Sequence, residues 1–195
     1  MEQINLSWFT AINAGANLHG FALGLAVFAA KYLVYFVVLG LAILWLRGEP
    51  KHRNTLLLAF GSCLIALFIN WVIGLIWYHP RPFVLGVGHT YLHHAPDSSF
   101  PSDHTTGLCA ISFVFLWREK VRSAITLLLL VVALCTAWAR IYVGLHYPFD
   151  ILGSMAVALF STLIMIYLAP LFEKHVMPIP EQIHRMLFQS HAKNG

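Results

Sequence analysis

Long apolar runs separated by short polar segments set the pattern of this sequence. A helix needs about 20 mainly apolar residues to cross a bilayer, and four of the five runs approach or exceed that length. We therefore predict an all-α fold, a polytopic transmembrane helical bundle. The third run is short, which suits a helix whose first turn opens at the membrane interface. The five predicted spans cover residues 20–46, 56–78, 103–117, 123–139 and 149–172.

The two ends of the chain have different patterns. In residues 1–19 apolar side chains recur at near-helical spacing and predict a helix lying in the membrane interface. Residues 174–195 form a polar tail with scattered apolar positions, which we expect on the cytoplasmic side. There is no internal repeat and no room for a second core, so residues 1–195 are predicted to be one integral membrane domain.

Composition agrees with an integral membrane protein. Hydrophobic residues make up 59% of the chain and charged residues only 10%, outside the range of ordinary soluble domains. The net charge of +4 is too small to indicate nucleic-acid binding. The three cysteines all lie inside apolar runs, which favours small buried side chains over disulfides or metal ligands: Cys63, Cys109 and Cys135.

The placement of basic residues predicts the topology. Short loops rich in Lys and Arg stay on the cytoplasmic side of a membrane. Such residues cluster after the first span, after the third span and in the tail: Arg47, Lys51, Arg53, Arg118, Lys120, Arg122, Lys174, Arg185 and Lys193. The N-terminus is then outside, and the segments before the third and fifth spans share the extracytoplasmic face with it.

Those outer segments hold the residues that could take part in catalysis or bind a ligand. The third run begins with Ser102-Asp103-His104, so the unpaired N–H groups of its first turn and the positive end of the helix dipole would face an anion. His104 adds a group that can donate a proton to a leaving oxygen. Ser102 and Asp103 are the neighbouring candidates for phosphate binding.

A second cluster precedes the fifth span. His146 and Asp150 lie four positions apart, with Pro148 as the expected first helical residue. Asp150 would then accept the imidazole N–H and leave His146 a neutral nucleophile toward phosphorus. Arg81 and Arg140 offer planar donor groups for the non-bridging phosphate oxygens. The predicted chemistry is phosphoryl transfer without a metal or other cofactor.

Taken one at a time, several of these residues could have a structural role and no part in catalysis. Lys31 lies in the middle of the first span, where a charge is costly without a partner; it either reaches the site or snorkels to water. His89 and His93, four apart in the outer loop, could bind zinc, although a lid over the site is the milder interpretation. One His or Arg alone would be explained as structural, but three motifs on one face favour function.

The three motifs resemble the signature of the type 2 phosphatidic acid phosphatase superfamily, the lipid phosphatase and vanadium haloperoxidase group. Its Arg-Pro, Pro-Ser-Gly-His and Ser-Arg-x5-His-x3-Asp patterns correspond here to Arg81-Pro82, Pro101–His104 and the segment from Arg140 to Asp150. This chain departs from the pattern at the family Lys, Gly and Ser, which are Gly74, Asp103 and Ala139.

More narrowly, the motif surroundings resemble undecaprenyl-diphosphatases of the bacitracin-resistance type. The resemblance implies hydrolysis of a polyprenyl diphosphate lipid, undecaprenyl diphosphate, on the outer face of the bacterial inner membrane, with His146 transiently phosphorylated. The motifs bind phosphate and do not distinguish lipid tails, so a phosphatidylglycerophosphate or phosphatidate phosphatase remains an alternative. A small anion or lipid transporter is the alternative from another class.

Overall fold

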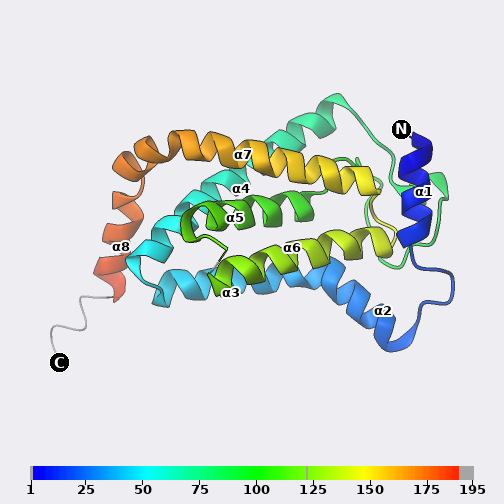
Figure 1. Ribbon diagram of the computed structural model, residues 1–195, viewed down its shortest axis with the longest axis horizontal. Coiled ribbons are helices and arrows are strands. Elements are labelled where there is room, and N and C mark those ends of the chain that lie inside the picture. Colours follow the sequence, from blue (N-terminus) through cyan, green and yellow to red (C-terminus); the bar gives the residue numbers. More distant parts are fainter. Residues whose placement is uncertain (1, 122, 189–195) are drawn as a thin grey trace.

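The computed structural model describes residues 2–121 and 123–188, and within these residues the secondary structure is helical throughout (Figure 1). The prediction of an all-α transmembrane bundle is confirmed. In chain order the elements are α1 (Glu2–Ile12), α2 (Gly20–Val27), the π-helical turn η1 (Phe28–Tyr32), α3 (Leu33–Arg47), α4 (Pro50–Ile76), the 3-10 turn η2 (Pro82–Leu85), α5 (Asp103–Glu119), α6 (Ala124–Tyr142), α7 (Pro148–His175) and α8 (Pro178–Phe188).

Four helical segments of the described chain are long and apolar enough to cross a membrane: Gly20–Arg47, Pro50–Ile76, Ala124–Tyr142 and Pro148–His175. The first of these is continuous through α2, η1 and α3. Large apolar side chains on these helices face outward, as expected where the surroundings are lipid rather than water. The chain is therefore a multi-pass membrane protein. The short third run of the sequence is α5, which has 17 residues.

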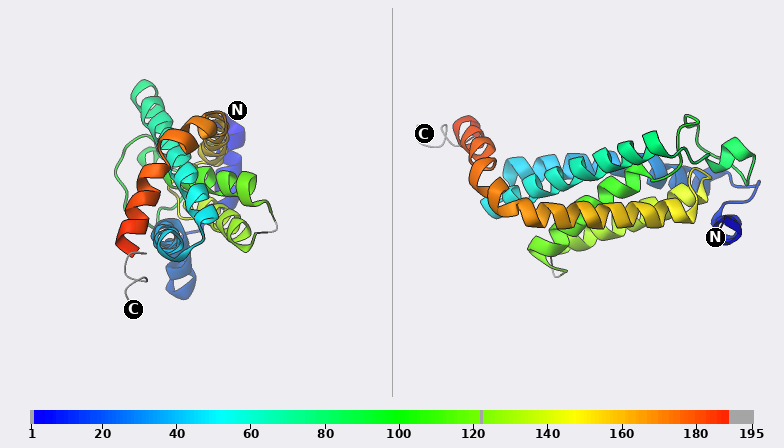
Figure 2. Two further views of the ribbon diagram at one scale, coloured as in Figure 1. Left: turned by 90° about the vertical axis from the view of Figure 1, so that its left-hand side faces the viewer. Right: turned by 90° about the horizontal axis from the view of Figure 1, so that it is seen from above.

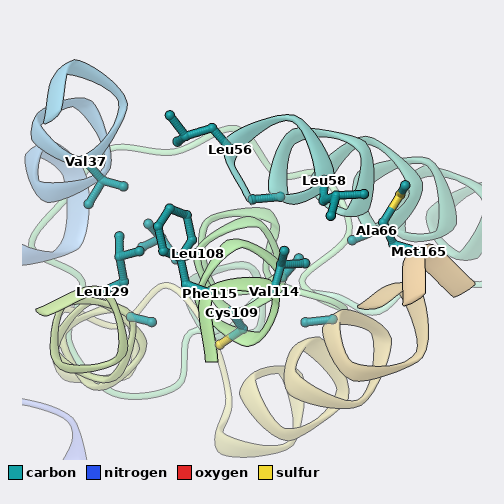
Figure 3. Packing of buried hydrophobic residues seen from close by; sticks show 14 of the residues in the cluster. Val37, Leu56, Leu58, Ala66, Leu108, Cys109, Val114, Phe115, Leu129 and Met165 are labelled. Atoms are coloured by element: carbon teal, nitrogen blue, oxygen red, sulfur yellow. The ribbon is translucent and has the colours of Figure 1, made fainter. Parts of the chain in front are cut away.

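Helix α5 is the centre of the bundle and packs against α4, α6 and α7. Its buried side chains Leu108, Val114 and Phe115 meet Leu58 of α4 and Leu129 of α6 (Figure 3). Alanines fill many of the remaining buried positions, and such small residues let helix backbones approach closely in a membrane. This packing fixes the position of the first turn of α5, where the Ser102-Asp103-His104 motif lies.

The two short terminal helices lie at opposite ends of the bundle (Figures 1 and 2). Helix α1 packs beside the start of α7, where the Asn5 side chain accepts a hydrogen bond of 2.9 Å from the backbone N–H of Phe149. Trp8 of α1 is half exposed, whereas Phe9 is buried. At the other end α8 is tied to α4 by an ion pair of 3.0 Å between Arg53 and Glu181. The chemistry-bearing motifs share the end near α1.

Candidate active site

The site forms where α6 ends and α7 begins. Arg140 lies in the last turn of α6, and the loop that follows turns back at Gly144, whose φ of +83° is favoured by glycine. Pro148 opens α7, and Asp150 in its first turn accepts a 2.8 Å hydrogen bond from the backbone N–H of Tyr147. This short, capped connection brings Arg140, His146 and Asp150 together, and all three are almost fully buried.

The imidazole of His146 is held in one tautomer by its surroundings. Nδ1 lies 2.8 Å from the backbone carbonyl of Ser99 and 3.5 Å from Oδ2 of Asp150. Both are acceptors, so Nδ1 carries the proton and Nε2 keeps a free lone pair. The sequence predicts that Asp150 fixes the tautomer, but the Ser99 carbonyl is the nearer partner, so Asp150 does not fix it alone.

Burial keeps His146 neutral. Desolvation lowers its pKa to about 3, with the positive charges of Arg140 and Arg81 acting in the same direction and Asp150 opposing them. A neutral imidazole, whose unprotonated nitrogen keeps its lone pair, is the reactive form of a histidine nucleophile. In this state His146 would need to lose no proton before acting as a nucleophile at neutral pH.

Two guanidinium groups converge on the reactive nitrogen. Arg81 Nη1 lies 3.1 Å and Arg140 Nη2 3.2 Å from Nε2 of His146. Arg81 is oriented by the carboxylate of Asp97 at 2.8 Å, and Arg140 by the carbonyl of Ala30 at 3.1 Å. Fixed donors placed around a nucleophile in this way can bind the non-bridging oxygens of a phosphoryl group as it is transferred.

The carboxylate of Asp150 lies near the imidazoles of His146 and His79. Its Oδ2 accepts hydrogen bonds from the Ser99 hydroxyl and the Tyr147 N–H. Its Oδ1 is buried without a hydrogen-bond partner in the described part of the chain, and Nε2 of His79 lies 3.9 Å away. Asp150 is thus a buried negative charge beside His146.

The start of α5 borders this cluster. Ser102 is fully buried, and its N–H donates to the hydroxyl of Ser154 on α7 at 2.8 Å, which ties the α5 start to α7. His104 is half-buried and lies close enough to Arg140 and Arg81 for their positive charges to disfavour its protonated form. His104 therefore shares the electrostatic environment of the two guanidiniums.

Two predicted site residues lie apart from this centre. The exposed Asp103 accepts a 2.8 Å hydrogen bond from Asn70 of α4, although its charge still acts on Arg140. Lys31 is exposed in η1, with its ammonium 5.3 Å from the ring centroid of Tyr32. Among the described residues no hydrogen bond or ion pair joins Lys31 to either guanidinium group of the site, so its part in the site stays a prediction.

Sequence reasoning missed several residues that build the site. Ser99 supplies a carbonyl to His146 and a hydroxyl to Asp150. Asp97 pairs with Arg81 and lies 3.5 Å from Nδ1 of His94. Burial lowers the pKa of His94, and the carbonyl of Ala95 opposes that shift. Only Ser99, directly before the Phe-Pro-Ser motif, had a neighbouring signal in the sequence.

At one end of a helical membrane bundle, a buried histidine thus lies between two arginines with a carboxylate beside it. This arrangement is typical of a phosphoryl-transfer centre in an integral membrane protein. The model of the PAP2 superfamily matches residues 55–173, which include all three motifs. The chain belongs to the PAP2 superfamily.

Two curated relatives agree with this assignment, and a solved structure shares the fold. The putative undecaprenyl-diphosphatase YbjG of Escherichia coli (strain K12) is 37% identical over 163 residues, covering 84% of this chain and 81% of that protein. The undecaprenyl-diphosphatase BcrC of Bacillus subtilis (strain 168) is 39% identical over 156 residues, covering 80% and 79%. The crystal structure of LpxE from Aquifex aeolicus superposes with a TM-score of 0.65 at 21% identity, covering 84% of this chain and 95% of that one.

Proposed function

We propose that this protein hydrolyses undecaprenyl diphosphate to undecaprenyl phosphate and inorganic phosphate. The observation that carries the proposal is the convergence of Arg81 and Arg140, at 3.1 and 3.2 Å, on Nε2 of the neutral His146. The names of the two curated relatives above support the choice of substrate. The general likeness in fold does not distinguish one lipid phosphate from another.

In the first step Nε2 of His146 attacks the terminal phosphorus of the diphosphate. The N–P bond forms as the bond between that phosphorus and the bridging oxygen breaks, and the lipid monophosphate leaves with the bonding electrons. The negative charge of the bound diphosphate offsets the positive charges of Arg81 and Arg140 and so favours a protonated His104, which donates its proton to the leaving oxygen. Arg81 and Arg140 stabilise the charge that spreads over the non-bridging oxygens, and the first N–H groups of α5, whose start the buried Ser102 ties to α7, complete the phosphate cradle.

In the second step water attacks the phosphohistidine. His104, now deprotonated, accepts the proton of that water, the N–P bond breaks, and inorganic phosphate leaves with His146 regenerated. As the N–P bond forms, the ring of His146 gains positive charge. Asp150, 3.5 Å from Nδ1, stabilises that charge.

We propose that the reaction takes place on the extracytoplasmic face of the bacterial inner membrane. The basic loops cluster at the end of the bundle where α3 meets α4 and α5 ends, opposite the start of α7 (Figure 1). Because basic loops remain cytoplasmic, the site faces outward. There the enzyme would recycle the carrier lipid of cell-wall synthesis, which would also account for bacitracin resistance.

The direct test is phosphate release by the purified protein from a panel of prenyl diphosphates and glycerophospholipid phosphates in detergent. We expect turnover of undecaprenyl diphosphate and none by His146→Ala. A preference for phosphatidylglycerophosphate or phosphatidate would replace the proposed substrate. No turnover of any lipid, with binding retained, would favour the transporter alternative.

A further inference from the structure

Two apolar cavities lie end to end on one face of α5, in the space between α3 and α4. The outer cavity, about 270 Å³, includes Asp103 and His104 in its lining. The inner cavity, about 370 Å³, extends to Trp45 near the end of α3. Both are lined by the same three residues where they meet, namely Val38, Cys63 and Ile111. Together they form one groove, which we call the α3–α4 groove.

Helical periodicity explains why the groove is straight. Its α5 side is formed by His104, Gly107 and Ile111, which follow each other at spacings of three and four residues and so share one helix face. On α3 the lining runs from Val34 to Trp45. At 1.5 Å per residue these eleven steps span about 16 Å, more than half of the hydrocarbon thickness of a bilayer.

The absence of a side chain at Gly107 keeps the outer part of the groove open. A Cβ at this position would lie 3.4 Å from the sulfur of Cys63, in contact with the opposite wall. Exposed apolar side chains form the rim, with Val38 58% and Phe60 61% exposed. A chain in the surrounding lipid can therefore enter sideways, without passing through the protein.

The groove is polar only at its outer end. That end is at His104, which lies within charge-interaction range of Arg81 and Arg140. An occupant must therefore combine a long apolar chain with an anionic head, and the head must lie where the guanidiniums are.

We propose that the α3–α4 groove binds the isoprenoid tail of the lipid diphosphate, with the diphosphate at His104 and the chain directed toward Trp45. This inference rests on the proposed function and adds the site of the tail to it. Since the bilayer is as apolar as the groove, transfer from lipid adds little, and the groove acts by shape. A chain held along it keeps the terminal phosphorus in line with His146, so binding of the remote tail assists the reaction.

A second apolar groove provides an internal comparison. It lies between α3 and α6, has a volume of about 420 Å³, and is lined by residues such as Phe36, Gly40 and Leu128. It is larger than either part of the α3–α4 groove, but its lining is apolar throughout and includes none of the predicted site residues. Only the α3–α4 groove is continuous with His104, so we assign the lipid tail to it and not to the α3–α6 groove.

The test compares two tryptophan substitutions. Cys63→Trp fills the α3–α4 groove where its two parts meet, with Cys63→Ala as the size control. Gly40→Trp fills the α3–α6 groove, where nothing lies within 4 Å of an added Cβ. Each variant is assayed for kcat/KM with undecaprenyl diphosphate and with a diphosphate that carries a single isoprene unit, too short to pass Cys63.

We expect Cys63→Trp to lower kcat/KM for undecaprenyl diphosphate by about tenfold or more while the short substrate stays within about twofold. Cys63→Ala and Gly40→Trp should leave the ratio of the two substrates unchanged. An equal loss on both substrates, no loss at all, or a selective loss in Gly40→Trp would overturn the proposal.

A measurement on the unmodified protein tests the proposal even if the tryptophan variant misfolds. A prenyl methylenediphosphonate with a benzophenone at the end of its chain is bound and photolysed, and the crosslinked peptide is identified by mass spectrometry. Crosslinks to Val38, Cys63 or Ile111 support the proposal, and crosslinks to Gly40 or Leu128 refute it. If the wild type cleaves no prenyl diphosphate, the proposed function itself fails, a result distinct from cleavage with crosslinks elsewhere.

Discussion

Replacing Asp150 by Asn tests how the buried carboxylate contributes to the reaction. The free His146 is neutral, because burial lowers its pKa to about 3. Its ring becomes positive only as the N–P bond forms, so the attraction of Asp150 is gained in the transition state and not before. At 3.5 Å and an effective dielectric constant of about 20, that attraction is about 5 kcal/mol, or roughly three to four orders of magnitude in kcat.

The substitution should change charge more than geometry. An Asn oxygen can still accept from the Tyr147 N–H and the Ser99 hydroxyl, and the Ser99 carbonyl still holds Nδ1 of His146 at 2.8 Å. The loss should therefore appear in kcat for phosphate release, with the thermal unfolding midpoint in detergent little changed. It should also slow the appearance of phosphohistidine in rapid-quench experiments.

Asp97→Asn is the matched control. This carboxylate contacts Arg81 at 2.8 Å, its side chain is 60% exposed, and it does not contact His146. We expect a change in kcat within about tenfold, because the exposed carboxylate of Asp97 is screened by water and contributes little to the buried guanidinium. If Asp150→Asn retained more than about a tenth of the wild-type kcat, or if Asp97→Asn lost as much, the charge argument would be refuted.

Three further predictions concern Arg140, His146 and the packing around Gly153. Arg140→Lys cannot donate at once to Ala30 and His146 as the planar fork does, so kcat/KM should fall by about a hundredfold with an unchanged unfolding midpoint; equal activity would contradict the role of the fork. Because the pKa of His146 is lowered to about 3, its ring should stay neutral from pH 7 down to pH 5; 15N NMR of histidine-labelled protein, with His146→Gln for assignment, would show protonation near pH 6.5 if this is wrong. Gly153→Ala would push a methyl group into the ring of Phe100 and should destabilise the protein by about 1–3 kcal/mol, seen as a lower unfolding midpoint; an unchanged midpoint would mean that the ring can move aside.

The fold was predictable because the hydrophobic pattern that determines it can be read along the sequence without knowing any tertiary contact. Apolar runs of membrane-crossing length are evident in the sequence, and the structure has helices at all five. The proline between His146 and Asp150 likewise predicted that the two residues would meet in a helix start, and they lie 3.5 Å apart.

The supporting groups were not predictable, since several of them are backbone carbonyls. Ala30 orients Arg140 from a π-helical turn that no motif announces, and Ser99 orients His146 through its main chain. A carbonyl is present at every residue, so its role depends only on tertiary placement. The grooves along α3 likewise arise where two or three helices meet, so no single helix carries a sequence pattern that predicts them.

The central claim is that His146 becomes covalently phosphorylated. The most direct measurement is acid-labile, alkali-stable 32P bound to the protein after rapid mixing with undecaprenyl diphosphate labelled in the terminal phosphate, followed by mass spectrometry of the labelled peptide. We predict label on His146 in the wild type, and none in His146→Ala. Turnover with no trapped label, or label on His104 in place of His146, would contradict the account.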